Sequence, residues 1–243
     1  MLFYLIAAVL GYYLFYCCVI RKNSVFFPVI FISFTVSVIY LFGIMEIIDF
    51  GVYLVAGFGC FLLIPALFVI IRQITQTEKA ERRTYVKKFL AGLFLNNMSV
   101  FMILCCVWVY FLMKGSAPSH CDDFSHWYRI CKIMDADRSL PSTPDLLYQY
   151  YPPGTALWIY FLTRFIPFSV PNCFRAQSLL NASCIAALMS VIPQVASKKA
   201  MAAGFICVCT AAAVLCAMDI TAYSLVVDGT LGLVPAAAAA CFC

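Results

Sequence analysis

The chain has 243 residues, of which 65% are hydrophobic and 11% are charged, and its mean hydropathy is +0.97. A soluble domain is only about 45–50% apolar, so this composition excludes an ordinary soluble protein. The net charge of +5 does not indicate a nucleic-acid partner, because the cations lie between apolar runs where the positive-inside rule places them. The sequence therefore predicts an integral membrane protein.

The apolar runs are long enough to form helices that cross a hydrocarbon core of about 30 Å at about 1.5 Å per residue. Most of the fourteen cysteines lie inside these runs and are interpreted as small hydrophobic residues. A disulfide between Cys121 and Cys131, which flank a polar stretch, is left open. The predicted fold class is all-α, a polytopic membrane helix bundle of about seven spans with an extracytoplasmic loop of juxtamembrane helices.

The charges between the runs give the orientation of the predicted bundle. Arg21 and Lys22 close the first span, which places that turn in the cytoplasm, and the turn with Glu46 and Asp49 has no cation, as is typical of an external turn. The cation-rich segment 72–88 is the strongest cytoplasmic signal. In chain order, the predicted spans cover residues 2–20, 26–47, 52–71, 89–113, 177–196 and 201–218, followed by a short apolar run at 230–243.

The run 155–170 decides the downstream topology, because it is short and contains Arg164 and Pro167. We expect it to lie in the membrane interface, so that Lys198 and Lys199 face the cytoplasm and Asp228 faces the outside. One membrane domain is expected over residues 1–243. It would comprise a three-helix portion at 1–88 and a second portion at 89–243, with an external loop at 114–174.

The polar stretch in this loop predicts an amphipathic helix over residues 122–134 that lies on the membrane. Its apolar stripe contains Phe124, Trp127, Cys131 and Met134, whereas Ser125, His126, Arg129 and Lys132 face elsewhere. Helix capping by Asp122 or Ser119 is the structural alternative to a catalytic role. A second short helix is expected after Pro141, followed by a rigid turn at Tyr151-Pro152-Pro153-Gly154.

The order of several short motifs resembles the GT-C superfamily of membrane glycosyltransferases over roughly residues 89–234. It is most similar to the branch that contains the protein O-mannosyltransferases and the lipid A aminoarabinose transferase. The matching elements are Asp122-Asp123, Ile130-Cys131-Lys132-Ile133-Met134, Leu140-Pro141, Tyr151-Pro152-Pro153-Gly154, Leu157-Trp158-Ile159-Tyr160, Arg175 and the segment from Tyr223 to Leu231. Many relatives have lysine where Tyr151 stands, and four predicted spans precede the acidic loop where relatives commonly have one.

The resemblance implies a polyprenyl-phosphate sugar donor and an external aspartate as the catalytic acid or base. That role falls on Asp122 or Asp123, with Asp228 as a second acid. A carboxylate takes the proton of a poor hydroxyl nucleophile, and a cation holds the charge that develops on the leaving phosphate. The residues expected to bind substrate are His126, Arg129, Lys132, Arg138, Tyr151, Arg164 and Arg175.

Three alternatives for these residues stay open. Two adjacent acids such as Asp122 and Asp123 could hold Mg²⁺ or Mn²⁺, although neighbours on a helix diverge by about 100°. His126 could be a ligand or proton carrier, or an interfacial residue beside Trp127. Arg164 could bind the donor, or extend from the interfacial helix to lipid phosphates.

The leading hypothesis is a plasma-membrane glycosyltransferase that inverts the anomeric carbon and acts on a lipid or polysaccharide acceptor outside the cytoplasm. A transporter or flippase of envelope lipids is the main alternative, and it predicts polar groups near the bilayer midplane on interrupted helices. A truncated, non-catalytic membrane protein is the third. The sequence does not identify the sugar, the acceptor or the oligomeric state.

Overall fold

The computed structural model describes residues 1–22, 24–95, 97–118, 126–141, 153–195 and 228–241. This part of the chain is helical and contains no strand. Its helices are α1 (Leu2–Leu14), α2 (Phe27–Ile44), α3 (Ile48–Gln76), α4 (Arg82–Phe94), α5 (Asn97–Leu112), α6 (Tyr128–Asp137), α7 (Gly154–Thr163), α8 (Val170–Val195) and α10 (Asp228–Ala240). A π-helical turn, Phe15–Val19, extends α1.

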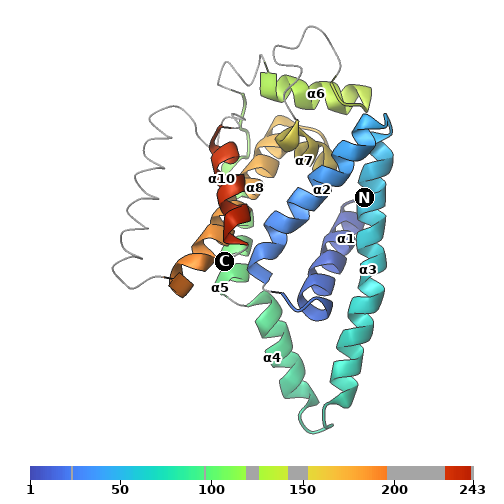
Figure 1. The fold of residues 1–243 in the computed structure, drawn as a ribbon, viewed down its shortest axis with the longest axis vertical. Helices are drawn as coiled ribbons and strands as arrows, with labels where there is room; N and C mark the ends of the chain where they lie inside the picture. Colours follow the sequence, from blue (N-terminus) through green and yellow to red (C-terminus); the bar gives the residue numbers. More distant parts are fainter. Residues whose placement is uncertain (23, 96, 119–125, 142–152, 196–227, 242–243) are drawn as a thin grey trace.

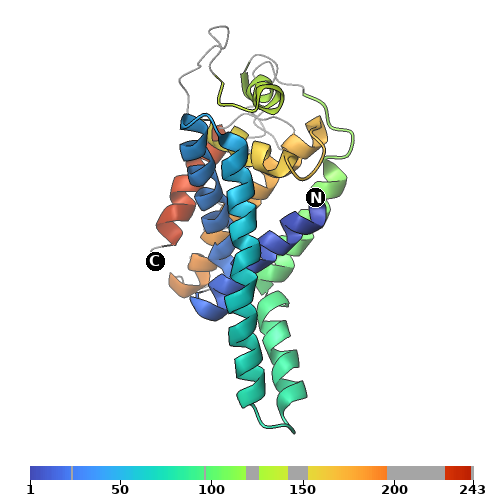
Figure 2. The same ribbon diagram turned by 90° about the vertical axis from the view of Figure 1, so that its right-hand side faces the viewer.

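The long helices run along the long axis of the molecule, whereas α6 lies across one end of it (Figures 1 and 2). We call this the α6 end. At the opposite end, which we call the hairpin end, α3 and α4 project beyond the other helices as a helical hairpin (Figure 1). The helix α10 begins toward the α6 end and runs back toward the middle of the bundle (Figures 1 and 2).

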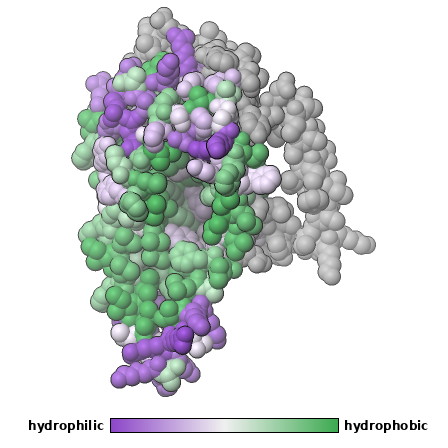
Figure 3. Space-filling model, turned by 180° about the vertical axis from the view of Figure 1, so that it is seen from behind, coloured by the Kyte–Doolittle hydropathy of each residue, from purple (hydrophilic) through white to green (hydrophobic). Residues whose placement is uncertain are grey.

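Three stretches of the described chain are long and apolar enough to cross a membrane, namely Leu2–Val19, Ser24–Ile44 and Ile48–Gln76. A wide apolar band separates two hydrophilic ends on the face shown in Figure 3. Large side chains of α3 are exposed along its length, including Phe61, which is 60% exposed, and Ile64 and Phe68, which are each 65% exposed. An exposed apolar surface of this extent is compatible with contact with lipid and not with water.

Glycines bring α1 and α3 into close contact. A Cβ atom added to Gly11 would lie 1.9 Å from the carbonyl oxygen of Gly59, and one added to Gly59 would lie 2.6 Å from the carbonyl oxygen of Ala8. The hydroxyl of Tyr12 also donates a hydrogen bond to the carbonyl oxygen of Val55 at 3.0 Å. Small residues allow backbones in membrane helix pairs to approach in this way, so dispersion contacts replace the missing hydrophobic driving force.

The predicted fourth span, 89–113, is two helices, because α4 ends at Phe94 and α5 begins at Asn97. The carbonyl oxygen of Leu93, in the last turn of α4, lies at this interruption. The hydroxyls of Tyr13 and Ser99 donate to that oxygen, at 2.5 Å and 3.0 Å respectively. Side chains from α1 and α5 thus bond to a backbone group at the break.

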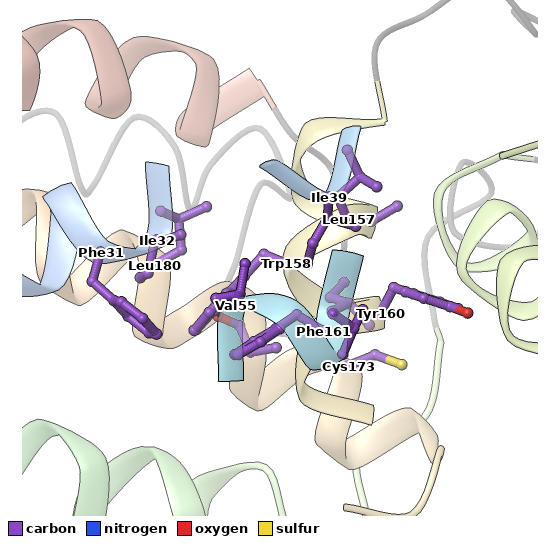
Figure 4. Close-up of a cluster of buried hydrophobic side chains, with 14 of the residues drawn as sticks. Phe31, Ile32, Ile39, Val55, Leu157, Trp158, Tyr160, Phe161, Cys173 and Leu180 are labelled. Atoms are coloured by element: carbon purple, nitrogen blue, oxygen red, sulfur yellow. Dashed lines mark hydrogen bonds between the residues drawn. The ribbon is translucent and has the colours of Figure 1, made fainter. Parts of the chain in front are cut away.

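The single helix predicted over 155–170 is divided in the structure, because α7 ends at Thr163 and α8 begins at Val170. The structure has α7 over ten residues, Gly154–Thr163, and this buried helix packs against α2, α8 and α6. Figure 4 shows its side chains Leu157, Trp158 and Phe161 inside the main apolar cluster. At about 15 Å, α7 is half the length needed to cross a hydrocarbon core. A helix that is apolar around its whole circumference is typical of a buried core helix, and that is the position of α7.

The other predicted elements agree in part with the structure. The span predicted at 177–196 begins earlier, at Val170 in α8. The predicted amphipathic helix is confirmed over its described part, because Ile130, Cys131 and Met134 are buried and Arg129 and Lys132 are exposed. The span predicted at 201–218 and the short helix predicted after Pro141 lie outside the described residues.

Candidate functional site

Five polar side chains meet at the α6 end, and we call them the α6-end cluster. Three short elements bring them together, since the first turn of α3, the C-terminal half of α6 and the end of α7 all lie there. The α6-end cluster consists of Asp49, Asp135, Arg138, Tyr160 and Arg164. With two carboxylates and two guanidinium groups, the cluster is formally neutral.

Asp49 is the residue that joins α3 to the other two elements. One carboxylate oxygen, Oδ1, accepts a hydrogen bond from the Tyr160 hydroxyl at 2.5 Å. The other, Oδ2, accepts one from the Arg138 guanidinium at 2.9 Å. Asp49 lies in the first turn of α3, where the partial positive charge of the helix N-terminus also favours a carboxylate. The exposed fraction is 32% for the Asp49 side chain and 54% for that of Arg138, so this ion pair is open to solvent.

Arg164 is the buried cation of the cluster, with a side chain that is 6% exposed. Its guanidinium forms an ion pair with Asp135 of α6 and lies 4.6 Å from the centroid of the Tyr160 ring. Within the described part of the chain, the buried Nε atom has no hydrogen-bond partner. A buried guanidinium is retained only where charges and aromatic rings compensate its lost hydration, and Asp135 and Tyr160 supply both.

The surroundings shift the pKa values of three members of the cluster. Burial, followed by the hydrogen bond to Asp49, raises the pKa of the Tyr160 hydroxyl well above its ordinary value. Burial lowers the pKa of Arg164, whereas the hydrogen bond to Asp49 is the main reason that the pKa of Arg138 is raised. At neutral pH the Tyr160 hydroxyl is therefore a hydrogen-bond donor and both guanidiniums are charged.

Of the residues predicted to bind substrate, Arg138 and Arg164 come together in the α6-end cluster. Arg129 and Lys132 are exposed on the outer side of α6. Arg175 lies outside the cluster. Its guanidinium donates to Asn172 at 2.8 Å and to the carbonyl oxygen of Tyr110 at 2.9 Å, and it stacks 4.4 Å from the Tyr110 ring centroid. Arg175 thus ties α8 to α5.

His126 was expected to face away from the apolar stripe, and this is corrected by the structure. Its side chain is only 4% exposed, and its ring centroid lies 4.4 Å from that of Trp127 in an edge contact. The five residues after it, through Cys131, continue in helical conformation toward the buried side of α6. The expected alternative of an interfacial histidine at the surface is therefore replaced by a buried one.

The predicted catalytic residues Asp122 and Asp123, and the predicted binding residue Tyr151, lie outside the described residues. Asp228 is the first residue of α10, the helix that begins toward the α6 end (Figure 1), and its side chain is not described. Cys131 is a buried free cysteine, so the disulfide left open for it is not formed here. In the described ranges no group of three or more His, Cys, Asp or Glu residues could hold a metal ion.

Sequence reasoning missed Asp49, Asp135 and Tyr160 as members of a polar site. Asp49 was used only as a sign of an external turn, and it is 111 residues from its partner Tyr160. No local motif joins such distant positions. One signal was present in the sequence. In an apolar protein, polar side chains such as those of Asp49, Tyr160 and Arg164 need partners.

The geometry thus describes a polar site with two arginines, a protonated phenol and two carboxylates on the end of an apolar helical bundle. No protein-family model matches the chain, and neither a curated protein nor a solved structure matches it.

Proposed function

We propose that this protein is a membrane glycosyltransferase of the GT-C type that moves a sugar from a polyprenyl-phosphate donor to an acceptor outside the cytoplasm. The observation that carries the proposal is the position of α6 across one end of the bundle (Figure 1). In the sequence, the polar segment that contains Asp122 and Asp123 directly precedes α6. Asp135 of α6 and Arg138, which follows its last residue, belong to the α6-end cluster. The described cations that the proposal uses, Arg138 and Arg164, both lie at this end.

The donor phosphate needs a cation in reach of solvent. Arg138 fits this requirement, because its side chain is 54% exposed and its present partner is a carboxylate, which the phosphodiester anion of the donor could displace. Arg164 is buried behind it and contributes fixed positive charge. Tyr160 donates its hydroxyl hydrogen bond to Asp49, so Asp49 remains held when Arg138 turns to a phosphate.

In the proposed reaction, Asp122 or Asp123 accepts the proton of an acceptor hydroxyl. The hydroxyl oxygen attacks the anomeric carbon and forms the new glycosidic bond. The bond between that carbon and the phosphate oxygen breaks on the opposite face, and the polyprenyl phosphate leaves with the electron pair. Arg138 and Arg164 stabilise the negative charge on the leaving phosphate. Direct displacement inverts the anomeric configuration.

A transporter would require charged groups near the middle of the bundle. On the face shown in Figure 3, hydrophilic residues gather at the two ends and the middle is apolar. This distribution favours a reaction at the membrane surface over transport through the bundle. The proposed acceptor is a lipid or a polysaccharide at the plasma membrane.

The proposal is tested with purified protein in lipid nanodiscs and radiolabelled decaprenyl-phosphate mannose, glucose and arabinose. The readout is transfer of label to lipid or glycan extracts. We expect transfer from at least one donor, loss of about 100-fold or more in Asp122→Asn or Asp123→Asn, and near-normal transfer in Asp137→Asn, an exposed acid at the end of α6. Equal transfer in all variants would overturn the catalytic assignment.

The orientation has its own test. A membrane-impermeant thiol reagent should label a Ser142→Cys variant in intact cells and should not label a Thr84→Cys variant, with labelling measured above that of the parent protein. The reverse pattern would place the α6 end in the cytoplasm and remove an extracytoplasmic acceptor.

A further inference from the structure

A pocket of about 520 Å³ lies within the helical bundle, away from the α6-end cluster. Residues of α1, α2, α5, α7 and α8 line it, so it reaches across most of the bundle. The face shown in Figure 3 is hollowed near the middle of the apolar band. The volume of the pocket is within the range of roughly 300–1,000 Å³ that is typical of ligand sites.

The walls of this pocket favour an apolar ligand. Most lining residues are apolar, and three of the lining hydroxyls, those of Tyr13, Ser99 and Ser183, are already bonded to backbone carbonyls. Tyr13 and Ser99 donate to the carbonyl oxygen of Leu93, and Ser183 donates to that of Leu179 at 2.7 Å. A cavity without polar partners does not hold ordered water. In a membrane, the fluid that can fill it is hydrocarbon.

One end of the pocket is lined by residues that follow two cations in the sequence. Its lining includes Ser24 and Val25 at the start of the second apolar stretch, and these residues directly follow the turn that carries Arg21 and Lys22. Both cations are exposed. The pocket also contacts Phe94, the last residue of α4, the helix that leads back from the cation-rich hairpin. A chain that enters here therefore has its head group beside exposed cations.

We infer that this pocket binds one acyl chain of an anionic phospholipid from the leaflet at the hairpin end, with the lipid phosphate beside Arg21 and Lys22. Charge complementarity selects the anionic lipid, and the apolar wall accepts its chain. Each cation near an anionic lipid surface contributes several-fold in affinity. The site is independent of the proposed sugar transfer, because it lies outside the α6-end cluster and uses none of its residues.

Trp158 is a built-in reporter for this inference. It lines the pocket, it is only 5% exposed, and its indole Nε1 donates to the carbonyl oxygen of Ala176 at 2.9 Å. Lipid around the protein cannot reach this ring unless a chain enters the pocket. The chain has three tryptophans, so the double variant Trp108→Phe/Trp127→Phe leaves Trp158 as the sole emitter. Trp108 is 68% exposed, so the double variant Trp127→Phe/Trp158→Phe reports contact with bulk lipid.

The experiment measures tryptophan quenching in nanodiscs of unlabelled phosphatidylcholine that contain a small fraction of phospholipid with brominated acyl chains. We expect Trp158 to be quenched at about fivefold lower mole fraction by brominated phosphatidylglycerol than by brominated phosphatidylcholine, and Trp108 to be quenched equally by both. In Arg21→Gln/Lys22→Gln the preference at Trp158 should disappear. The matched variant Lys79→Gln/Arg83→Gln, which removes two exposed cations at the hairpin tip, should retain it.

Three results would overturn the inference: no quenching of Trp158, equal quenching by both head groups, or a preference that survives in Arg21→Gln/Lys22→Gln. A fourth is relief of the quenching by decaprenyl phosphate at lower mole fraction than by unlabelled phosphatidylglycerol, which would assign the pocket to a polyprenyl lipid. If the double charge variant fails to fold, Ile103→Phe, which enlarges an exposed lining residue, should weaken the quenching about fivefold or more instead.

Discussion

The hydroxyl of Tyr160 donates a hydrogen bond of 2.5 Å to Oδ1 of Asp49, and 111 residues of chain separate the two. This contact joins the buried helix α7 to the first turn of α3. Figure 4 shows Tyr160 at the edge of the apolar cluster, with its hydroxyl directed away from it. The ring contributes to the core while the oxygen belongs to the α6-end cluster, so one side chain couples packing to the polar site.

Removing this hydroxyl should destabilise the protein. We expect Tyr160→Phe to lower the free energy of unfolding by about 1–3 kcal/mol, because the bond is made to a charged acceptor and its donor is buried. The measurement is reversible unfolding in mixed micelles. Arg138→Gln should cost only about 0–1 kcal/mol, because that ion pair is open to solvent. A larger loss in Arg138→Gln than in Tyr160→Phe would contradict the assignment of Tyr160 as the main tie.

The raised pKa of Tyr160 predicts a pH dependence in the alkaline range. The folded state holds the phenolic proton more tightly than the unfolded state, whose pKa is near the ordinary value of 10.0. The stabilisation is therefore complete below that value and is lost as the pH rises through the higher folded pKa. The stability difference between the wild type and Tyr160→Phe should stay constant from pH 7 to about 9.5 and shrink above about pH 10. A difference that grows above that pH would refute it.

The ion pair between Arg164 and Asp135 predicts which of two substitutions destabilises the protein more. Asp135→Asn leaves the buried guanidinium without its counter-charge, whereas Arg164→Met leaves a carboxylate that is 27% exposed and can be hydrated. We expect about 3 kcal/mol of destabilisation for Asp135→Asn and about 1–2 kcal/mol for Arg164→Met. Thermal unfolding of both variants checks the order, and the double variant should be less destabilised than the sum of the two. The opposite order would show that Asp135 is not the group that compensates Arg164.

Because α1 and α3 are in close contact, we expect that even one methyl group added at Gly11 does not fit between them. In Gly11→Ala, the new Cβ would lie 1.9 Å from the Gly59 carbonyl oxygen, so the helices must separate and lose contact along their length. We expect destabilisation of about 3 kcal/mol or more. Gly92→Ala is the matched control, because among the described residues no atom beyond the adjoining backbone of α4 lies within 4 Å of its added Cβ, and a helical alanine should stabilise by up to about 1 kcal/mol. Similar unfolding midpoints for the two variants would contradict the close approach.

The sequence predicts the long apolar helices well, because each carries a continuous apolar run and charged residues at its ends. The first three spans lie where the runs and the cations indicate. The amphipathic helix is also predicted from the sequence, since helical spacing places Arg129 and Lys132 on the side opposite Cys131 and Met134. Local pattern is sufficient for these elements.

The sequence does not predict what depends on distant partners. Residues 155–163 form a short apolar run directly before Arg164, and only their contacts with α2, α6 and α8 show that α7 is buried. The break between α4 and α5 falls within one apolar run, where Tyr13 from α1 donates to the carbonyl oxygen of Leu93. The pairing of Asp49 with Tyr160 has no local signature for the same reason.

The length of α3 has a practical consequence. Its 29 residues extend about 44 Å, some 14 Å more than a hydrocarbon core, and α4 returns alongside. Arg82 braces the connection by donating to the carbonyl oxygens of Thr75 and Thr77 at 2.9 Å and 3.0 Å. A soluble helical carrier domain joined in frame to both helices at this tip would move with the bundle as one body. A 27.1 kDa chain would then offer single-particle imaging a fixed marker for alignment outside the micelle.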